Sequence, residues 1–236
     1  MKLFPDNPGN PPKSWLLTII KYNAGNIQSV LYALERIGMK AEVTDDVEKI
    51  RLADKVIFPG VGEASTAMHY LKERGLDAVI KNLKQPVLGI CLGMQLMCRY
   101  SEENATDCLG IFDEEVRRYP QPLKEGYKVP QIGWNNIYNL KTDLFRDVKE
   151  NSFCYFVHSY YASIGEHTIA TTNYIQPYSS ALRKNNFYGV QFHPEKSAEV
   201  GRADTQKFCP KSLTLRLQGT LEVNYERETC FIRPTR

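Results

Sequence analysis

The chain has 236 residues, 42% of them hydrophobic and 24% charged, and it carries a net charge of +3 at pH 7. This composition is too apolar for a disordered chain and too evenly charged for a nucleic-acid-binding surface. No apolar run reaches the roughly 18 residues of a membrane span, and the first residues lack the apolar core of a secretory signal. We therefore expect a cytoplasmic protein of one domain that binds neither membranes nor nucleic acid.

The six cysteines follow no metal-binding or disulfide pattern. They form no CxxC pair and do not cluster with histidines at metal-ligand spacing. In a cytoplasmic chain we expect reduced thiols, no metal site and no cofactor. Buried cysteines usually act as small apolar side chains, and only Cys91 lies in a motif that suggests a reaction.

The first expected element follows a proline-rich extension. Residues 1–14 hold four prolines without apolar periodicity, so we expect them to be disordered. Residues 16–21 form a short apolar run typical of a buried parallel strand. A helix should follow, capped by Asn26 and ended by Gly38, because apolar residues recur along one face. These residues are Ile27, Val30, Leu31, Leu34 and Ile37.

The alternation of strand and helix continues through the first hundred residues. Further strands are expected at residues 41–44, 55–58 and 86–90. Further helices are expected at residues 45–52, 64–74 and 76–83. This order predicts an α/β fold with a mostly parallel central sheet flanked by helices. Aromatic and β-branched runs between residues 129 and 191 predict additional strands, some of them antiparallel.

The segment GICLGMQLM, residues 89–97, has the pattern of a nucleophile elbow with cysteine in place of serine. Gly89 and Gly93 permit a sharp turn from strand to helix, which would expose the sulfur of Cys91 at the carboxyl edge of the sheet. The start of the following helix favours a thiolate. Taken alone, the pattern fits a reactive thiol and a core cysteine equally well.

A base for this thiol is offered by GVQFHPEKS, residues 189–197. In an extended segment His193 and Glu195 face the same side, so the carboxylate can orient the imidazole toward Cys91. His158 is the second candidate for the base, but no carboxylate stands beside it in the sequence. We expect His69 and His167 to occupy surface or helix positions without a role.

The segment FPGVGEAS, residues 58–65, places a glycine-rich loop after a predicted strand. It lacks GK[ST] and GxGxxG, which excludes the P-loop and dinucleotide-binding patterns. The glycines on either side of Val61 let its backbone N–H turn toward a developing oxyanion, together with the N–H of Leu92. We therefore expect an oxyanion hole at Val61 and Leu92.

In this order, PGVG, GICLGMQ, YFVHSYY and QFHPEKS resemble the class I, triad-type glutamine amidotransferases. Within that superfamily, YNAGN (residues 22–26) and VPQIGWNN (residues 129–136) are similar to the glutaminase subunits of imidazole glycerol phosphate synthases. The resemblance runs from about residue 16 to residue 201 and implies a single amidotransferase domain over residues 15–201.

The resemblance implies roles that agree with the chemistry above. Cys91 is expected to be the nucleophile, His193 the base and acid, and Glu195 the orienting residue. By family similarity, the residues that hold the substrate glutamine are Gly60, Gln95, Glu103, Ser159 and Tyr160.

The resemblance also implies a partner. Such subunits form a heterodimer with a (βα)8-barrel cyclase, which receives the ammonia and makes imidazole glycerol phosphate and AICAR in histidine biosynthesis. The residues expected at the docking face and ammonia gate are Asn26, Trp134, Tyr155 and Lys196. An ordinary core position is the alternative for Trp134.

Residues 202–236 depart from the family, whose chains normally end in an amphipathic helix. They show no helical apolar face, and codon choices exist for which a shifted reading frame near Gly201 encodes such a helix. We therefore expect residues 202–236 to be a frameshifted, poorly ordered tail.

Two other functions remain open from the sequence. The chain could be the glutaminase subunit of another pathway, such as pyridoxal phosphate or purine synthesis, but VPQIGWNN argues against this. It could also be a catalytically weak regulatory pseudo-enzyme, but the intact triad argues against that.

Overall fold

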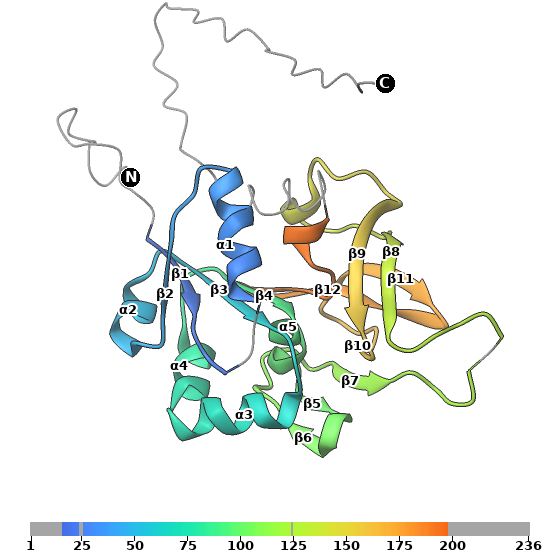
Figure 1. Cartoon of the computed structure of the whole chain (residues 1–236), viewed down its shortest axis with the longest axis horizontal. Helices are drawn as coiled ribbons and strands as arrows, with labels where there is room; N and C mark the ends of the chain where they lie inside the picture. The colour runs from blue at the N-terminus through green and yellow to red at the C-terminus, as the bar shows by residue number, and fades with distance from the viewer. Residues whose placement is uncertain (1–15, 24–25, 124, 198–236) are drawn as a thin grey trace, which may run out of the picture.

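The computed structural model describes residues 16–23, 26–123 and 125–197 (Figure 1). The expected extension (1–14) and tail (202–236) lie outside these residues. The helices are α1 (Ile27–Arg36), α2 (Val47–Leu52), α3 (Ala64–Glu73), α4 (Leu76–Asn82) and α5 (Leu92–Met97), with short 3-10 helices η1 (Glu103–Ala105), η2 (Asp143–Phe145) and η3 (Pro194–Lys196).

The strands of the first half are β1 (Leu17–Ile20), β2 (Ala41–Thr44), β3 (Lys55–Gly60), β4 (Val87–Cys91), β5 (Tyr100–Ser101), β6 (Thr106–Asp107) and β7 (Glu115–Arg118). Those of the second half are β8 (Gln131–Ile137), β9 (Ser152–His158), β10 (Tyr160–Ala162), β11 (Thr168–Tyr174), β12 (Gln176–Lys184) and β13 (Phe187–Val190). Each strand and helix expected in the first hundred residues is present, with ends shifted by no more than two residues.

Most strands belong to one large mixed sheet. In its parallel part the neighbours are β2, β1, β3, β4 and β13. The sheet continues from β13 through β12 and β10, which pair in antiparallel fashion. Strands β8 and β9 form a separate antiparallel pair. The prediction of a mostly parallel central sheet with additional antiparallel strands is therefore confirmed.

The parallel part is covered on both faces, as parallel sheets require. Along β3, Val56 and Phe58 pack in one hydrophobic cluster with residues of α3, α4 and α5. Ile57, between them, packs in a second cluster with residues of α1. Figure 1 shows α1 on one side of the sheet and α3 and α4 on the other. This alternation explains why the strand sequences read as continuous apolar runs.

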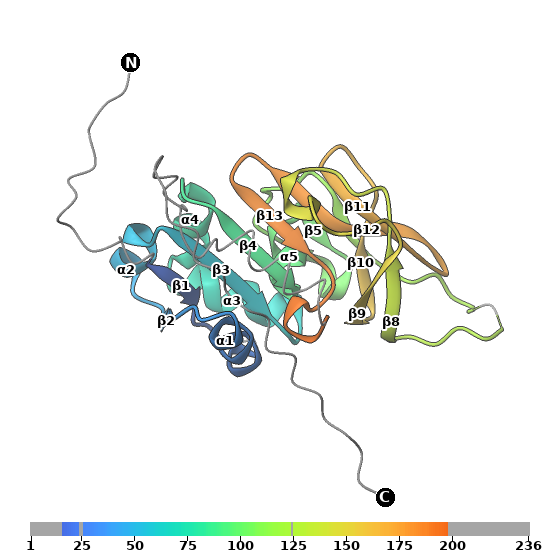
Figure 2. The ribbon, with the colours of Figure 1, turned by 90° about the horizontal axis from the view of Figure 1, so that it is seen from above.

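The pairing of three strands assembles the site. Figure 2 shows β3, β4 and β13 side by side in the middle of the sheet. Gly60 of β3 pairs with Cys91 of β4, and Ile90 pairs with Val190 of β13. Because parallel strands end at the same edge, the loop after β3, the turn at Cys91 and the segment after β13 meet there. Ligands of open α/β sheets bind at this carboxyl edge.

None of the helices in the described part of the chain is long and apolar enough to cross a membrane. Among the same residues, no group of three or more His, Cys, Asp or Glu side chains is arranged to hold a metal ion.

Candidate active site

Cys91 occupies the expected turn between β4 and α5. Its backbone has φ 54° and ψ −110°, a left-handed φ that is uncommon for residues other than glycine. A Cβ on Gly93 would lie 1.8 Å from the backbone oxygen of Phe58, and one on Gly89 would lie 2.3 Å from Cε of Met97. The two glycines therefore allow α5 to pack directly on β3 and β4, and this close packing holds the strained turn.

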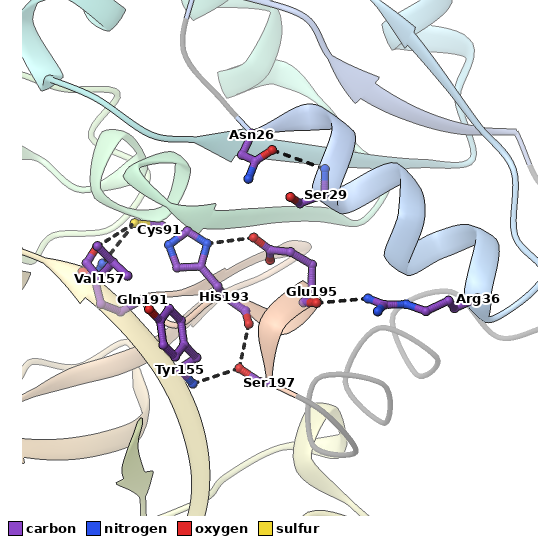
Figure 3. Close-up of polar contacts among 10 residues, drawn as sticks. All are labelled: Asn26, Ser29, Arg36, Cys91, Tyr155, Val157, Gln191, His193, Glu195 and Ser197. Carbon is purple, nitrogen blue, oxygen red and sulfur yellow. Dashed lines mark hydrogen bonds and ion pairs between the residues drawn. The ribbon is translucent and has the colours of Figure 1, made fainter. Parts of the chain in front are cut away.

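The side chains of His193 and Glu195 meet as the sequence predicts. Nδ1 of His193 lies 2.8 Å from Oε1 of Glu195, and both side chains are buried (Figure 3). The predicted backbone was wrong, because Pro194–Lys196 form the 3-10 helix η3 instead of an extended segment. The proline begins this turn, since its fixed φ suits the first position of a helix.

Bonds from neighbouring elements fix the turn that carries the base. The hydroxyl of Ser197 donates to the backbone oxygen of His193 at 2.6 Å and accepts from the backbone N–H of Tyr155 at 3.0 Å. Arg36, the last residue of α1, donates to the backbone oxygen of Glu195 at 3.1 Å. In Figure 3 the imidazole of His193 lies between Cys91 and Glu195. Helix α1 and strand β9 thus hold the segment that carries His193 and Glu195 from two sides.

The surroundings of His193 favour its protonated form. Burial disfavours the charged ring, but hydrogen bonds to Cys91 and Glu195, with their charges, raise the pKa of His193 to about 10. Because part of this rise comes from the negative charge on Cys91, the raised pKa belongs to the imidazolium paired with the thiolate, which is the state that follows transfer of the thiol proton to His193.

His158 is unsuited to be the base. Its Nδ1 lies 2.8 Å from the backbone oxygen of Tyr160 and its Nε2 lies 3.3 Å from the hydroxyl of Tyr178. Burial lowers the pKa of His158 to about 4, so the ring is neutral at pH 7. Its neutral ring forms part of the pocket lining.

Of the two histidines expected to have no role, His69 is exposed on α3, as predicted. The prediction of a surface or helix position was wrong for His167, which is buried in the turn before β11. Its backbone N–H donates to the buried carboxylate of Glu114 at 2.8 Å. That contact joins residues 53 positions apart, so the local sequence could not reveal it.

A pocket of about 340 Å³ lies over Cys91. The predicted site residues that line it are Asn26, Val61, Cys91, Leu92, Gln95, Glu103, Ser159, Tyr160, His193 and Lys196. The lining also includes Gly62, Pro130, Val157 and His158, for which the sequence predicted no role in holding the substrate. Gly60 does not line this pocket and instead lies beside Cys91 in the sheet.

Two predicted substrate residues have defined partners. Nε2 of Gln95 donates to the backbone oxygen of Tyr160 at 2.8 Å. Oε2 of Glu103 accepts from the backbone N–H of Ala64 at 2.8 Å, at the start of α3. Burial, and the nearby charge of Glu63, raise the pKa of Glu103, while the Ala64 bond opposes that shift.

Trp134 and Tyr155 lie on one face of the β8–β9 pair. They are register partners, with ring centroids 5.8 Å apart, and Nζ of Lys196 lies 5.6 Å from the Tyr155 ring centroid. Trp134 is 53% exposed, which rules out the core alternative. Ile132 and Phe153, on the same face, are also exposed. Ile132 and Phe153 were not predicted from the sequence, although the alternation of residues along both strands indicated a shared face.

Comparison with known proteins agrees with this geometry. The chain matches the family described as "Glutamine amidotransferase class-I" over residues 18–208. Among solved structures, a Thermoplasma acidophilum protein assigned to GMP synthase has a TM-score of 0.63 at 16% identity, covering 82% of this chain and 92% of that one. PurLQS from Thermotoga maritima has a TM-score of 0.61 at 14% identity, covering 83% and 97%. At such identities these two likenesses show the fold.

Sequence relatives are much more similar. The imidazole glycerol phosphate synthase subunit HisH of Bacteroides fragilis is 60% identical over 192 residues, which cover 81% of this chain and 97% of the relative. The protein of the same name from Haemophilus influenzae is 46% identical over 196 residues, covering 83% and 97%. The chain therefore belongs to the class I glutamine amidotransferases and, within them, to the family of the imidazole glycerol phosphate synthase subunit HisH.

Proposed function

We propose that the chain hydrolyses glutamine to glutamate and ammonia and passes the ammonia to a (βα)8-barrel cyclase, with which it forms a cytoplasmic heterodimer. The cyclase then makes imidazole glycerol phosphate and AICAR in histidine biosynthesis. The observation that carries the proposal is the 2.8 Å contact between His193 and Glu195, beside a cysteine on a strained turn in one pocket.

The first half of the reaction breaks the side-chain amide. His193 takes the proton of Cys91, and the sulfur attacks the amide carbon of glutamine. The oxyanion formed accepts hydrogen bonds from the N–H groups of Val61 and Leu92, two residues that line the same pocket as Cys91. His193 then gives its proton to the leaving nitrogen, so that ammonia departs and a γ-glutamyl thioester remains on Cys91.

The second half returns the enzyme to its starting state. His193 takes a proton from water, the resulting hydroxide attacks the thioester carbon, and the sulfur leaves. His193 returns the proton to the sulfur and glutamate is released. Glu195 holds the ring in one orientation and stabilises its positive charge in both halves.

The amino-acid end of the substrate needs a site for its charges. The Glu103 carboxylate suits the α-ammonium group, with Gln95, Ser159 and Tyr160 beside it in the pocket lining. Gly60 does not line the pocket, and a Cβ on it would lie 2.8 Å from the backbone nitrogen of Gly93, so its proposed contribution is to let the start of the oxyanion loop pack closely against α5.

The exposed face around Trp134 is the proposed docking surface for the cyclase. Aromatic side chains with this exposure are common at the centres of interfaces. Lys196 and Asn26 line the pocket itself, so a partner seated here can meet the released ammonia before it reaches solvent.

The test is glutamate release from glutamine, measured with and without a cyclase partner loaded with its nucleotide substrate. We expect strong stimulation by the loaded partner. Constitutive turnover without stimulation would favour another pathway, and no turnover in either state from a folded protein would favour a pseudo-enzyme. Cys91→Ala should abolish turnover, and full activity in that variant would overturn the mechanism.

A further inference from the structure

Gln191 is a fully buried amide whose two ends contact the nucleophile and a predicted substrate residue. Its Nε2 donates to Sγ of Cys91 at 3.7 Å, and its Oε1 accepts from Nε2 of Gln95 at 2.9 Å. Its backbone N–H donates to the oxygen of Ser180 in β12 at 2.9 Å, which fixes the residue on the sheet. Figure 3 shows Gln191 beside Cys91, on the strand end that leads to His193. The mechanism above uses none of these contacts.

The hydrogen bonds determine which way both amides point. Nε2 of Gln95 lies against two acceptors, the backbone oxygen of Tyr160 and Oε1 of Gln191. If the Gln191 amide were reversed, two NH2 groups would face each other without an acceptor. The carbonyl oxygen of Gln95 is therefore left for other partners, and the NH2 group of Gln191 is directed at the sulfur.

This arrangement suits a sulfur that becomes negative during the reaction. A hydrogen bond strengthens when its acceptor is ionised, so the Gln191 N–H stabilises the thiolate more than the thiol. An amide does not titrate near neutral pH and cannot take the proton meant for His193. In the resting state the thiol instead donates to the backbone oxygen of Val157, at 3.8 Å.

We propose that Gln191 is a positioning residue that steadies the Cys91 thiolate through its NH2 group and, through its carbonyl oxygen, fixes the Gln95 amide with its oxygen toward the substrate. The inference rests on the proposed glutaminase function, and it extends that function by coupling nucleophile and substrate recognition through one side chain. The ligand atom that the Gln95 oxygen would accept from is an N–H of the bound amino acid.

Two substitutions separate the two ends of the amide. Gln191→Glu keeps an acceptor for Gln95 but removes the NH2 donor, so we expect kcat to fall about 10-fold to 100-fold with little change in KM. Methionine is similar in size to glutamine, and Gln191→Met removes both the NH2 donor and the carbonyl acceptor. KM should therefore rise as well, because the Gln95 amide is free to reverse. Gln85→Glu is the matched control, since Nε2 of Gln85 donates to a backbone oxygen of α2, at 2.8 Å, outside the pocket lining.

A second measurement reports on the sulfur without turnover. The rate of Cys91 alkylation by iodoacetamide, followed by mass spectrometry of the Cys91 peptide, is measured against pH for each full-length variant. The other titratable side chains around the sulfur are His193, Tyr22 and His158, with Glu195 behind His193, and Glu103 and Lys196 in the pocket lining. None of these groups is altered in the variants, but Gln191→Glu adds a carboxyl group beside the sulfur, so Gln191→Met, which adds no titratable group, gives the shift due to the lost donor alone.

The midpoint of the alkylation profile should move to higher pH by about one unit in both Gln191 variants and stay unchanged in Gln85→Glu. If folded Gln191→Glu and Gln191→Met keep the wild-type profile and the wild-type kcat and KM, the proposal is wrong. If Gln191→Glu does not fold, Gln191→Met alone decides. A wild-type chain without turnover would contradict the proposed glutaminase function. The alkylation comparison would still test whether Gln191 stabilises the Cys91 thiolate.

Discussion

The two walls of the pocket are held by different forces. On one wall, β3, β4 and α5 position Cys91 by close packing, with glycine contacts that leave no room for a methyl group. On the other wall, β9, β13 and η3 position His193 through hydrogen bonds to Glu195, Ser197 and Tyr155. The position of the proposed nucleophile thus depends on close packing, and that of the proposed base depends on polar partners, so damage to the two walls should appear in different measurements.

After loss of Cys91 itself, the largest expected effect comes from breaking the polar wall at Glu195. Glu195→Gln keeps the size of the side chain but removes the charge that orients and stabilises the imidazolium, so kcat/KM should fall about 1000-fold. Glutamate release with the loaded cyclase measures this. Thermal unfolding should change little, and turnover within about tenfold of wild type would contradict the assigned role.

Next in size is a break in the packed wall at Gly93. A Cβ here would overlap the backbone oxygen of Phe58, which cannot move without shifting β3. Gly93→Ala should lower the free energy of unfolding by about 3 kcal/mol or more, measured by urea denaturation. Gly75→Ala is the matched control: its site is open but has φ 65°, so we expect a loss of only about 1 kcal/mol. Equal losses at the two sites would remove the argument for steric positioning.

The buried polar wall should also respond to acid through His158. Its folded pKa, about 4, lies below the ordinary unfolded value of about 6.5. Between these pH values the unfolded chain binds a proton that the folded chain does not, so stability falls with falling pH, by about 2 kcal/mol at pH 5. His193 has the opposite shift and is protonated in both states below about pH 6.5, so it adds no slope there.

The measurement for His158 is the unfolding free energy of wild type and His158→Asn across this pH window. The variant is expected to be less stable overall but to lose less stability on acidification. His69→Asn, at an exposed site, should keep the wild-type slope. An unchanged slope in His158→Asn would show that the buried ring is not the cause.

The smallest effect is expected outside both walls, on the exposed face of β8 and β9. Trp134→Ala should weaken binding of the cyclase about tenfold or more, because a large aromatic contact is lost, without changing the unfolding midpoint. Titration calorimetry with the cyclase measures this. Ile164→Ala is the control, since Ile164 is equally exposed but lies outside this strand pair. Wild-type affinity in Trp134→Ala would move the docking face elsewhere.

The sequence by itself determined the parallel half of the fold and the three residues proposed as the triad. Short apolar runs separated by periodic helices specify a covered parallel sheet, because buried strands leave no room for polar side chains. Cys91 after one such strand, and His193 followed two residues later by Glu195, have few other chemical explanations. These signals are local, so they can be recognised before the chain is folded.

Tertiary structure alone decided which polar groups surround Cys91 and which aromatic side chains are exposed. Gln191 and Cys91 are 100 residues apart, and their contact depends on β13 pairing with β4. The sequence leaves His158 as a candidate base, but in the folded chain Tyr160 and Tyr178 contact its two ring nitrogens. The sequence allows a core position for Trp134, but β8 pairs with β9 apart from the large sheet and leaves the face that carries Trp134 exposed. Burial and amide orientation are set by partners distant in sequence, which no local pattern encodes.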